Sequence, residues 1–239
     1  MIKMQRDFKS ISPEEFTKWN EEMVRKYDPD AFHHHSNPII RYIEGKRVKV
    51  IFKLMDIDKD DRVLEIGCGA GNVITKASNG KLFGIDISPF ILAKAKQKLN
   101  QRVSLFQGDA QKLPCKNGIF MYVICSEVLE HLLYPSDALR EMARILKPQG
   151  IVIISVPNEL LINGIKDILI KLRIFRWLFY RRGEYKEIPT RMDDEWHLHT
   201  FRLNEWLNLF EKFFKVHRLR RIPFLWLPLR YVFRLEKVE

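Results

Sequence analysis

A glycine-rich turn that follows a short apolar segment constrains the fold of this chain more than any other feature. Residues 62–66 read Arg-Val-Leu-Glu-Ile, which is typical of a parallel strand covered on both faces, and Gly67, Gly69 and Gly71 follow directly. Glycine suits such a turn because it accepts positive φ values and leaves main-chain N–H groups open to a ligand at the start of a helix. The stretch therefore predicts a strand–turn–helix unit that binds a nucleotide-like cofactor.

Further strands and helices alternate along the chain on both sides of this unit. Apolar runs predict strands at residues 62–66, 81–85, 103–107, 119–125 and 151–156, with helices over 72–78, 89–99 and 136–146. Parallel neighbours need crossover connections, so we expect a Rossmann-like doubly wound α/β sheet with helices on both faces. Candidate late strands at 215–221 and 231–238 extend it to a mostly parallel seven-stranded sheet, whose ligand lies at the carboxyl ends of the strands.

The segments that flank this core have a different character. Residues 1–45 are expected to form a helical leader or lid, with a helix that starts at Ser12-Pro13, and another helix is expected over 39–55. Residues 46–239 would then form one domain, with a helical insertion at 157–200. Residues 160–182 of that insertion mix apolar and basic side chains, which fits either contact with an anionic membrane or burial over the site. The adjacent histidines 33–35 favour a solvated or aromatic-packed loop over a metal site.

The overall composition is that of a globular protein without a membrane span. Hydrophobic residues make up 46% of 239 residues, but the longest apolar runs are far too short to cross a bilayer. The charged first residues differ from a secretion signal, so we expect a cytoplasmic location, with peripheral membrane association left open. Three cysteines without metal-type spacing are expected to be free thiols. A net charge of +11 favours anionic partners but does not choose among nucleic acid, phospholipid and phosphorylated metabolites.

The glycine spacing separates two classes of cofactor. Gly67-x-Gly69-x-Gly71 differs from the Gly-x-Gly-x-x-Gly motif of dinucleotide-binding proteins, and Glu65 precedes it. With that acidic residue, the stretch resembles the first motif of the class I S-adenosylmethionine-dependent methyltransferases. Asp86 and Asp109 follow the second and third predicted strands, as the resemblance requires.

This resemblance implies S-adenosylmethionine as the cofactor and S-adenosylhomocysteine as its product. It implies that the turn and Glu65 hold the methionine portion, that Asp86 accepts hydrogen bonds from the ribose hydroxyls, and that Asp109 with the Ala110 N–H brackets the adenine. The cofactor-binding residues it implies are Glu65, Gly67, Cys68, Gly69, Gly71, Asp86, Ile87, Asp109, Ala110 and Ser126.

A second informative stretch, Glu127-Val-Leu-Glu130-His131, follows the fourth predicted strand. Positions i, i+3 and i+4 share one face of a helical turn, so the two carboxylates and the imidazole are expected to converge. The pattern resembles that of quinone-biosynthesis O-methyltransferases, which implies that His131 lies near the acceptor. An imidazole titrates near neutral pH, so His131 is the candidate base that takes the proton of an acceptor hydroxyl. The expected reaction is O-methylation of a small, partly apolar or lipid-like acceptor.

Two other functions remain open from the sequence. The same pattern resembles that of small-RNA 3′-end 2′-O-methyltransferases, which implies Mg²⁺ held by Glu127, Glu130, His131 and His199 and an RNA acceptor. Nucleic acid is the less favoured partner because the cations are spread along the chain and no stacking platform is evident. A non-catalytic cofactor-binding module that docks at a membrane is the other alternative.

Overall fold

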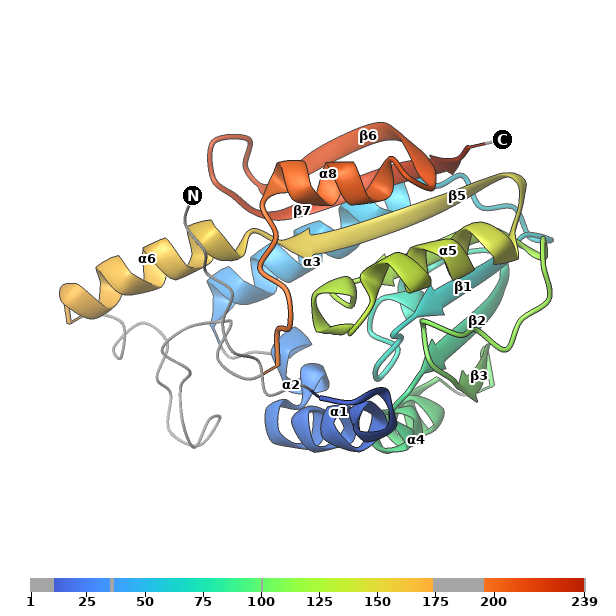
Figure 1. The fold of residues 1–239 in the computed structure, drawn as a ribbon, viewed down its shortest axis with the longest axis horizontal. Coiled ribbons are helices and arrows are strands. Elements are labelled where there is room, and N and C mark those ends of the chain that lie inside the picture. The colour runs from blue at the N-terminus through green and yellow to red at the C-terminus, as the bar shows by residue number, and fades with distance from the viewer. Residues whose placement is uncertain (1–10, 35–36, 100, 174–195, 239) are drawn as a thin grey trace.

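The N-terminal region consists of three helices. The computed structural model describes residues 11–34, 37–99, 101–173 and 196–238 (Figure 1). In the first part of the chain lie α1 (Pro13–Tyr27), α2 (Pro29–His33) and α3 (Pro38–Lys53). The helix predicted from Ser12-Pro13 begins where expected, because the Ser12 hydroxyl accepts a hydrogen bond from the Glu15 N–H and the Glu15 carboxylate accepts one from the Ser12 N–H. The helix predicted over 39–55 corresponds to α3, with Asn37 as its cap.

Seven strands form one sheet at the centre of the molecule. They are β1 (Arg62–Ile66), β2 (Lys81–Asp86), β3 (Val103–Gln107), β4 (Phe120–Ser126), β5 (Leu146–Pro157), β6 (Phe214–Pro223) and β7 (Pro228–Lys237). Their order is β3-β2-β1-β4-β5-β7-β6. β1 to β5 are parallel, but β7 is antiparallel to both β5 and β6, so the sheet is mixed. The predicted Rossmann-like seven-stranded sheet is confirmed at this level.

Helices cover both faces of the sheet. α5 (Pro135–Ile145) and α8 (Leu203–Phe210) pack Leu139, Met142 and Trp206 onto one face, in front of the sheet in Figure 1. α3 lies behind the sheet and contributes Val48 and Ile51 to a second core cluster. α4 (Pro89–Lys98) packs into this second cluster as well. Side chains alternate between the faces along β1, which explains its continuous apolar sequence.

Three predicted boundaries were wrong. The helix predicted over 72–78 is a single 3₁₀ turn, η1 (Ile74–Lys76). The helix predicted over 136–146 is α5, which begins one residue earlier, at Pro135, after Tyr134 as its cap. β5 starts five residues earlier than predicted because Leu146 pairs with Phe120 before a register shift.

The predicted insertion lies partly outside the described residues. α6 (Glu159–Lys171) begins directly after β5, with Asn158 as its cap, and extends away from the sheet (Figure 1). The remainder of the predicted basic segment, residues 174–195, falls outside the described residues. Among the helices that the structure describes, none combines the length and apolarity needed to cross a membrane.

Candidate functional site

A cavity of about 620 Å³ opens at the carboxyl ends of β1, β2 and β4, where the strand order reverses. The glycine turn and the ends of these strands line one part of it, and side chains of α3, α6 and the β6–β7 loop line another. α1 also contributes, through Phe16, Asn20 and Val24. The reversal point of an open α/β sheet is where such folds bind their ligands. We therefore treat this cavity as the candidate site.

The glycine turn is fixed against β2 by its own main chain. The Cys68 N–H donates to the Ile85 carbonyl at 3.0 Å, and the Gly69 N–H donates to the Asp86 carboxylate at 2.9 Å. Gly67 has a φ of +64°, and a Cβ there would lie 2.3 Å from Cγ2 of Val128. No side chain fits at Gly67, so the main chain itself forms this wall of the cavity.

Two carboxylates lie beside the turn, the buried Glu65 and the half-buried Asp86. Glu65 accepts a hydrogen bond from the Ile74 N–H at 2.9 Å, and burial nevertheless raises its pKa to about 8. Asp86 ends β2 and accepts a second hydrogen bond from the Ser88 N–H at 3.0 Å. Burial also raises the pKa of Asp86, although the two main-chain donors oppose this effect. Both residues line the cavity.

Most of the residues named from the sequence as cofactor-binding surround the same cavity. Nine of the ten line it: Glu65, Gly67, Cys68, Gly69, Asp86, Ile87, Asp109, Ala110 and Ser126. Gly71 is outside this lining, and a Cβ on it would meet Leu99 at 2.6 Å, so its place is in the packing of the turn. Asp109 follows β3 and accepts from the Gln111 N–H at 2.8 Å.

The sequence did not predict a buried network of charges in the cavity wall. Arg47 of α3 donates through Nε to Glu44 at 3.0 Å and also contacts the Ser126 hydroxyl at the end of β4. Arg230 of β7 lies 2.7 Å from Glu127, and these arginine side chains are 3% and 8% exposed. The sequence did indicate that Arg47 is buried, because it lies between Ile43 and Ile51 at helical spacing, on the inward face of the helix.

The expected convergence of Glu127 with Glu130 and His131 is absent from the described structure. Glu127 has a φ of +57° and precedes the 3₁₀ turn η2 (Leu129–His131), so it does not share the helical face. Its carboxylate accepts from the Ser155 hydroxyl at 2.9 Å and pairs with Arg230. The predicted fourth member, His199, directs Nε2 to the Leu132 carbonyl at 2.8 Å.

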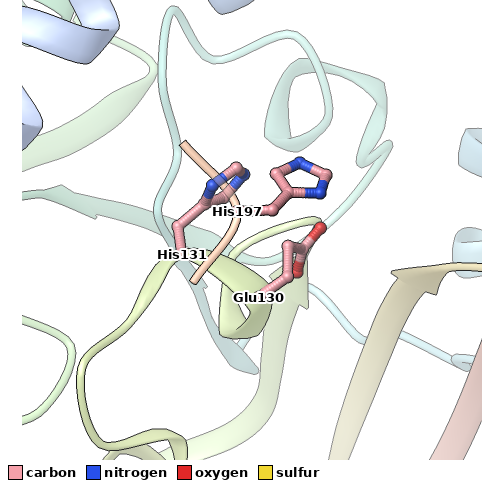
Figure 2. Close-up of side chains that lie close together, drawn as sticks. All are labelled: Glu130, His131 and His197. Carbon is pink, nitrogen blue, oxygen red and sulfur yellow. The ribbon is translucent and has the colours of Figure 1, made fainter. Parts of the chain in front are cut away.

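The structure gathers a different set, Glu130, His131 and His197, on the cavity wall (Figure 2). The ring centroids of His131 and His197 are 4.6 Å apart. Burial lowers the pKa of His131 well below its usual value, and the neighbouring His197 adds to this effect, so the His131 imidazole is neutral at neutral pH. Burial also raises the pKa of Glu130 well above its usual value, helped by Glu127. His197 is a site residue that the sequence did not predict.

The rest of the cavity wall is apolar. Its side chains come from segments far apart in the sequence: Ile39, Ile40, Ile43, Ile162, Ile165, Leu169, Leu227 and Leu229. His33, at the end of α2, also lines the cavity, and the remaining histidines of that run are an exposed His34 and a residue outside the described part of the chain. An elongated or partly apolar ligand fits this half better than a highly charged one.

The fold and the cavity together define a Rossmann-like protein with a nucleotide-type cofactor site. Comparison with known families identifies the class more closely, because residues 64–154 match the family model described as a methyltransferase domain. Residues 64–154 thus carry a methyltransferase domain of the class I S-adenosylmethionine-dependent type.

Two proteins have sequences that are similar to part of this chain. An uncharacterised protein of Methanocaldococcus jannaschii is 31% identical over 153 residues, which is 63% of each chain. A demethylmenaquinone methyltransferase of Staphylococcus aureus is 36% identical over 112 residues, covering 44% of this chain and 46% of the relative. The chain thus matches less than two thirds of the length of these relatives.

Solved structures share the fold at low sequence identity. One is a chain from the complex between the Haloferax volcanii Trm112 methyltransferase activator and a methyltransferase, with a TM-score of 0.64 and 17% identity over 92% of this chain and 96% of that one. Another is a possible histamine N-methyltransferase of Thermotoga maritima, with a TM-score of 0.62 and 19% identity over 93% of this chain and all of the other. At these identities the likeness concerns the fold.

Proposed function

We propose that this protein transfers a methyl group from S-adenosylmethionine to a hydroxyl of a small, partly apolar or lipid-like acceptor. The observation that carries the proposal is the continuity of one cavity, whose wall includes the glycine turn, the Glu130–His131–His197 cluster and the apolar side chains of α3 and α6. A cofactor and an apolar acceptor can therefore occupy neighbouring parts of the same space, as an in-line transfer requires.

The residues around the glycine turn fit the chemistry of this cofactor. S-adenosylmethionine supplies an activated methyl group. Gly67 leaves room for the cofactor beside the main chain, and the Asp86 carboxylate can accept hydrogen bonds from the ribose hydroxyls. Asp109 and Ala110, which follow β3, can contact the adenine. Glu65 acts through the turn, because its carboxylate holds the Ile74 N–H at the first residue of η1.

His131 has the features expected of a residue that handles the acceptor proton. Its Nδ1 lies 3.2 Å from the Trp196 carbonyl, which can only accept, so Nδ1 carries the hydrogen and Nε2 keeps a free lone pair. The Trp196 ring lies 4.4 Å from the imidazole and restricts its rotation. An acceptor hydroxyl becomes a good nucleophile once Nε2 of His131 takes its proton.

A quinone-like acceptor is the first class to test. The Staphylococcus aureus relative carries the name demethylmenaquinone methyltransferase and matches 44% of this chain. The apolar wall formed by Ile165 and Leu169 of α6 and by Leu227 suits the ring and chain of such a molecule.

The rim of the apolar half supports peripheral contact with an anionic membrane. Leu225 and Trp226 of the β6–β7 loop are 74% and 77% exposed, and Ile168 of α6 is exposed as well. Lys46 lies 4.7 Å above the Phe224 ring and adds a cation to the same loop. Exposed aromatic side chains next to cations favour the interface of an anionic bilayer, from which a lipid-like acceptor would reach the cavity.

The test is transfer of a labelled methyl group from S-adenosylmethionine to the hydroxyls of a panel of acceptors that contains demethylmenaquinol (the reduced form, which carries hydroxyls), long-chain phenols, histamine and short RNA. We expect labelling of the quinone-like or phenolic compounds, with His131→Ala lowering kcat at least 100-fold while cofactor affinity remains. Labelling confined to RNA would replace this proposal with the RNA 2′-O-methyltransferase alternative. Cofactor binding without any labelled product in a cell lipid extract would favour the non-catalytic module.

The membrane contact has its own measurement. Wild-type protein should sediment with vesicles that contain 30% phosphatidylserine, and Leu225→Ser/Trp226→Ser should remain in the supernatant. The matched control is Tyr134→Ser, which removes an aromatic side chain that is also exposed but lies outside the loop and the cavity. Wild-type protein that stays in the supernatant would contradict the membrane contact and leave the methyltransferase proposal intact.

A further inference from the structure

We propose that Glu130, His131 and His197 form a binding site for one divalent transition-metal ion in the cavity. One ligand atom from each residue lies within 4.8 Å of the others in the described structure (Figure 2). Bonds of about 2.1 Å to a shared ion bring ligand atoms within about 4 Å of one another, so small side-chain rotations close the site. The site stands on its own geometry, whereas the role of the ion rests on the proposed function.

The two imidazoles are held in the way that metal-binding histidines are held. His131 directs Nδ1 to the Trp196 carbonyl at 3.2 Å, and His197 directs Nδ1 to the Glu159 carboxylate at 2.9 Å. An oxygen partner at Nδ1 fixes the tautomer, orients the ring and leaves the Nε2 lone pair available. The Glu159 carboxylate is also held, because it accepts from the Thr200 hydroxyl at 2.6 Å.

The Glu130 carboxylate supplies an independent indication. Glu130 is 1% exposed, and among the described residues neither of its carboxylate oxygens has a hydrogen-bond partner. Burial of a carboxylate without a hydrogen-bond partner is unfavourable, because the oxygens lose their contacts with water and gain none in return. A cation bound between Glu130 and the two imidazoles would satisfy these oxygens.

The main chain holds the two ligand-bearing segments together. The Glu130 carbonyl accepts from the Leu198 N–H at 2.8 Å and from the His199 N–H at 3.2 Å, which joins η2 to residues 196–199. The His131 N–H donates to the Val128 carbonyl at 3.0 Å and completes the tight turn. These main-chain hydrogen bonds therefore position His197 opposite Glu130 and His131 before any ion binds.

The donor set indicates the class of ion. Two imidazoles and one carboxylate suit Zn²⁺, Co²⁺, Mn²⁺ or Fe²⁺, whereas Mg²⁺ prefers oxygen ligands. Three protein ligands also leave a coordination position open. That position is available to the acceptor hydroxyl, whose pKa the ion would lower, and the ion would then replace the free lone pair of His131 in that role.

Co²⁺ binding to the chelator-treated protein tests the site, because tetrahedral or five-coordinate Co²⁺ has visible absorption bands. We expect one Co²⁺ per chain, displaced by Zn²⁺, with affinity at least 10-fold lower in His197→Ala and in Glu130→Gln. His217→Ala is the matched control, since His217 is an exposed surface histidine paired with Glu236 and should leave binding within twofold of wild type. Melting temperature and S-adenosylmethionine affinity identify variants that fail to fold. If His197→Ala fails to fold, Glu130→Gln is the variant that tests the site.

The inference is overturned if the wild-type protein binds no stoichiometric Co²⁺ or Zn²⁺. Binding that survives in both His197→Ala and Glu130→Gln overturns it too, because the ion would then occupy another site, such as the histidines at 33–35. Methyl transfer is not part of this readout. A failed metal titration with intact methyl transfer leaves His131 as the base, and metal binding without methyl transfer rejects the proposed reaction alone.

Discussion

The two halves of the cavity are built in different ways. The part of the cavity that we propose for the cofactor, called the cofactor half below, is made of short, contiguous motifs at the ends of β1, β2 and β3. Main-chain N–H groups donate many of its hydrogen bonds, such as that from Gly69 to the Asp86 carboxylate. The part that we propose for the acceptor, the apolar half described above and called the acceptor half below, combines α3, α6, β7 and residues 196–197, which are distant in sequence, and joins them through buried side chains. The first half depends on backbone shape and the second on long-range charge and packing.

Because of this difference, substitutions in the two halves should affect different properties of the protein. In the cofactor half a substitution acts on ligand binding, because the strands beneath the turn pair independently of it. In the acceptor half the same side chains line the cavity and connect the N-terminal helices to the sheet, so a substitution acts on stability as well. Arg47, which joins α3 to β4, is the clearest case.

The largest effect is expected from Arg47→Met. The substitution leaves Glu44, whose side chain is 5% exposed, with Arg230 at 4.0 Å as its nearest cation among the described residues. Removal of one partner from a buried ion pair costs about 3–5 kcal/mol, because the other charge stays buried. Urea denaturation should show this loss in the free energy of unfolding.

The matched control for this prediction is Glu44→Leu/Arg47→Met, which removes both charges. It should recover most of the lost stability, since two apolar side chains of similar size replace a buried pair at little cost. If the single variant unfolds within 1 kcal/mol of wild type, the acceptor half does not depend on this network, and the contrast between the halves fails.

In the cofactor half, Gly67→Ala should reduce affinity for S-adenosylmethionine about 100-fold, or about 2.7 kcal/mol. The reason is the φ of +64° at Gly67 together with the 2.3 Å approach of a Cβ to Val128, which forces the turn to move. Isothermal titration calorimetry gives the dissociation constant.

Gly45→Ala in α3 is the control, because a Cβ there meets nothing within 4 Å and alanine favours a helix. It should leave cofactor affinity unchanged and slightly raise stability. A Gly67→Ala protein that binds the cofactor within threefold of wild type would show that the backbone shape of the turn is not what the cofactor requires.

The same contrast explains what the sequence could predict. The seven strands, the glycine turn and the positions of Asp86 and Asp109 depend on local apolar runs and turn residues. The structure has all of them, although β5 begins five residues earlier than predicted. The segment between Gly71 and β2 was predicted as a full helix, but the structure has there the single 3₁₀ turn η1.

The polar residues of the acceptor half could not be predicted in the same way. His197 rather than His199 lies beside His131, and the choice depends on the path of a segment without regular secondary structure, which the Glu130 carbonyl holds in place. Likewise, Arg47 reaches Ser126 across 79 residues of sequence. Such partners follow from the packing of α3 on the sheet and not from the local sequence.

A smaller effect is expected from Ile165→Asn in α6. Ile165 lines the apolar half, so a polar amide there should raise KM for an apolar acceptor about 10-fold, or about 1.4 kcal/mol, without a change in cofactor affinity. Gly164→Asn is the control, because Gly164 is exposed on the same helix and has open space at Cβ. An unchanged KM in Ile165→Asn would place the acceptor outside this half of the cavity.

The smallest effect concerns pH and His33, which lines the acceptor half. Burial lowers the pKa of His33 from 6.5 to about 4, with Arg47 and Lys98 lowering it further and Glu44 and Asp30 opposing them. The unfolded state therefore binds more protons than the folded state between these values, so stability is complete above pH 6.5 and declines as pH falls toward 4. Between pH 6.5 and pH 5.5 this single group should cost about 1 kcal/mol. His33→Gln, which does not titrate, should lose that much less than wild type over the same interval in urea denaturation. Equal losses in the two proteins would mean that His33 is solvated in the folded state, and the acceptor half would then be open to water at α2.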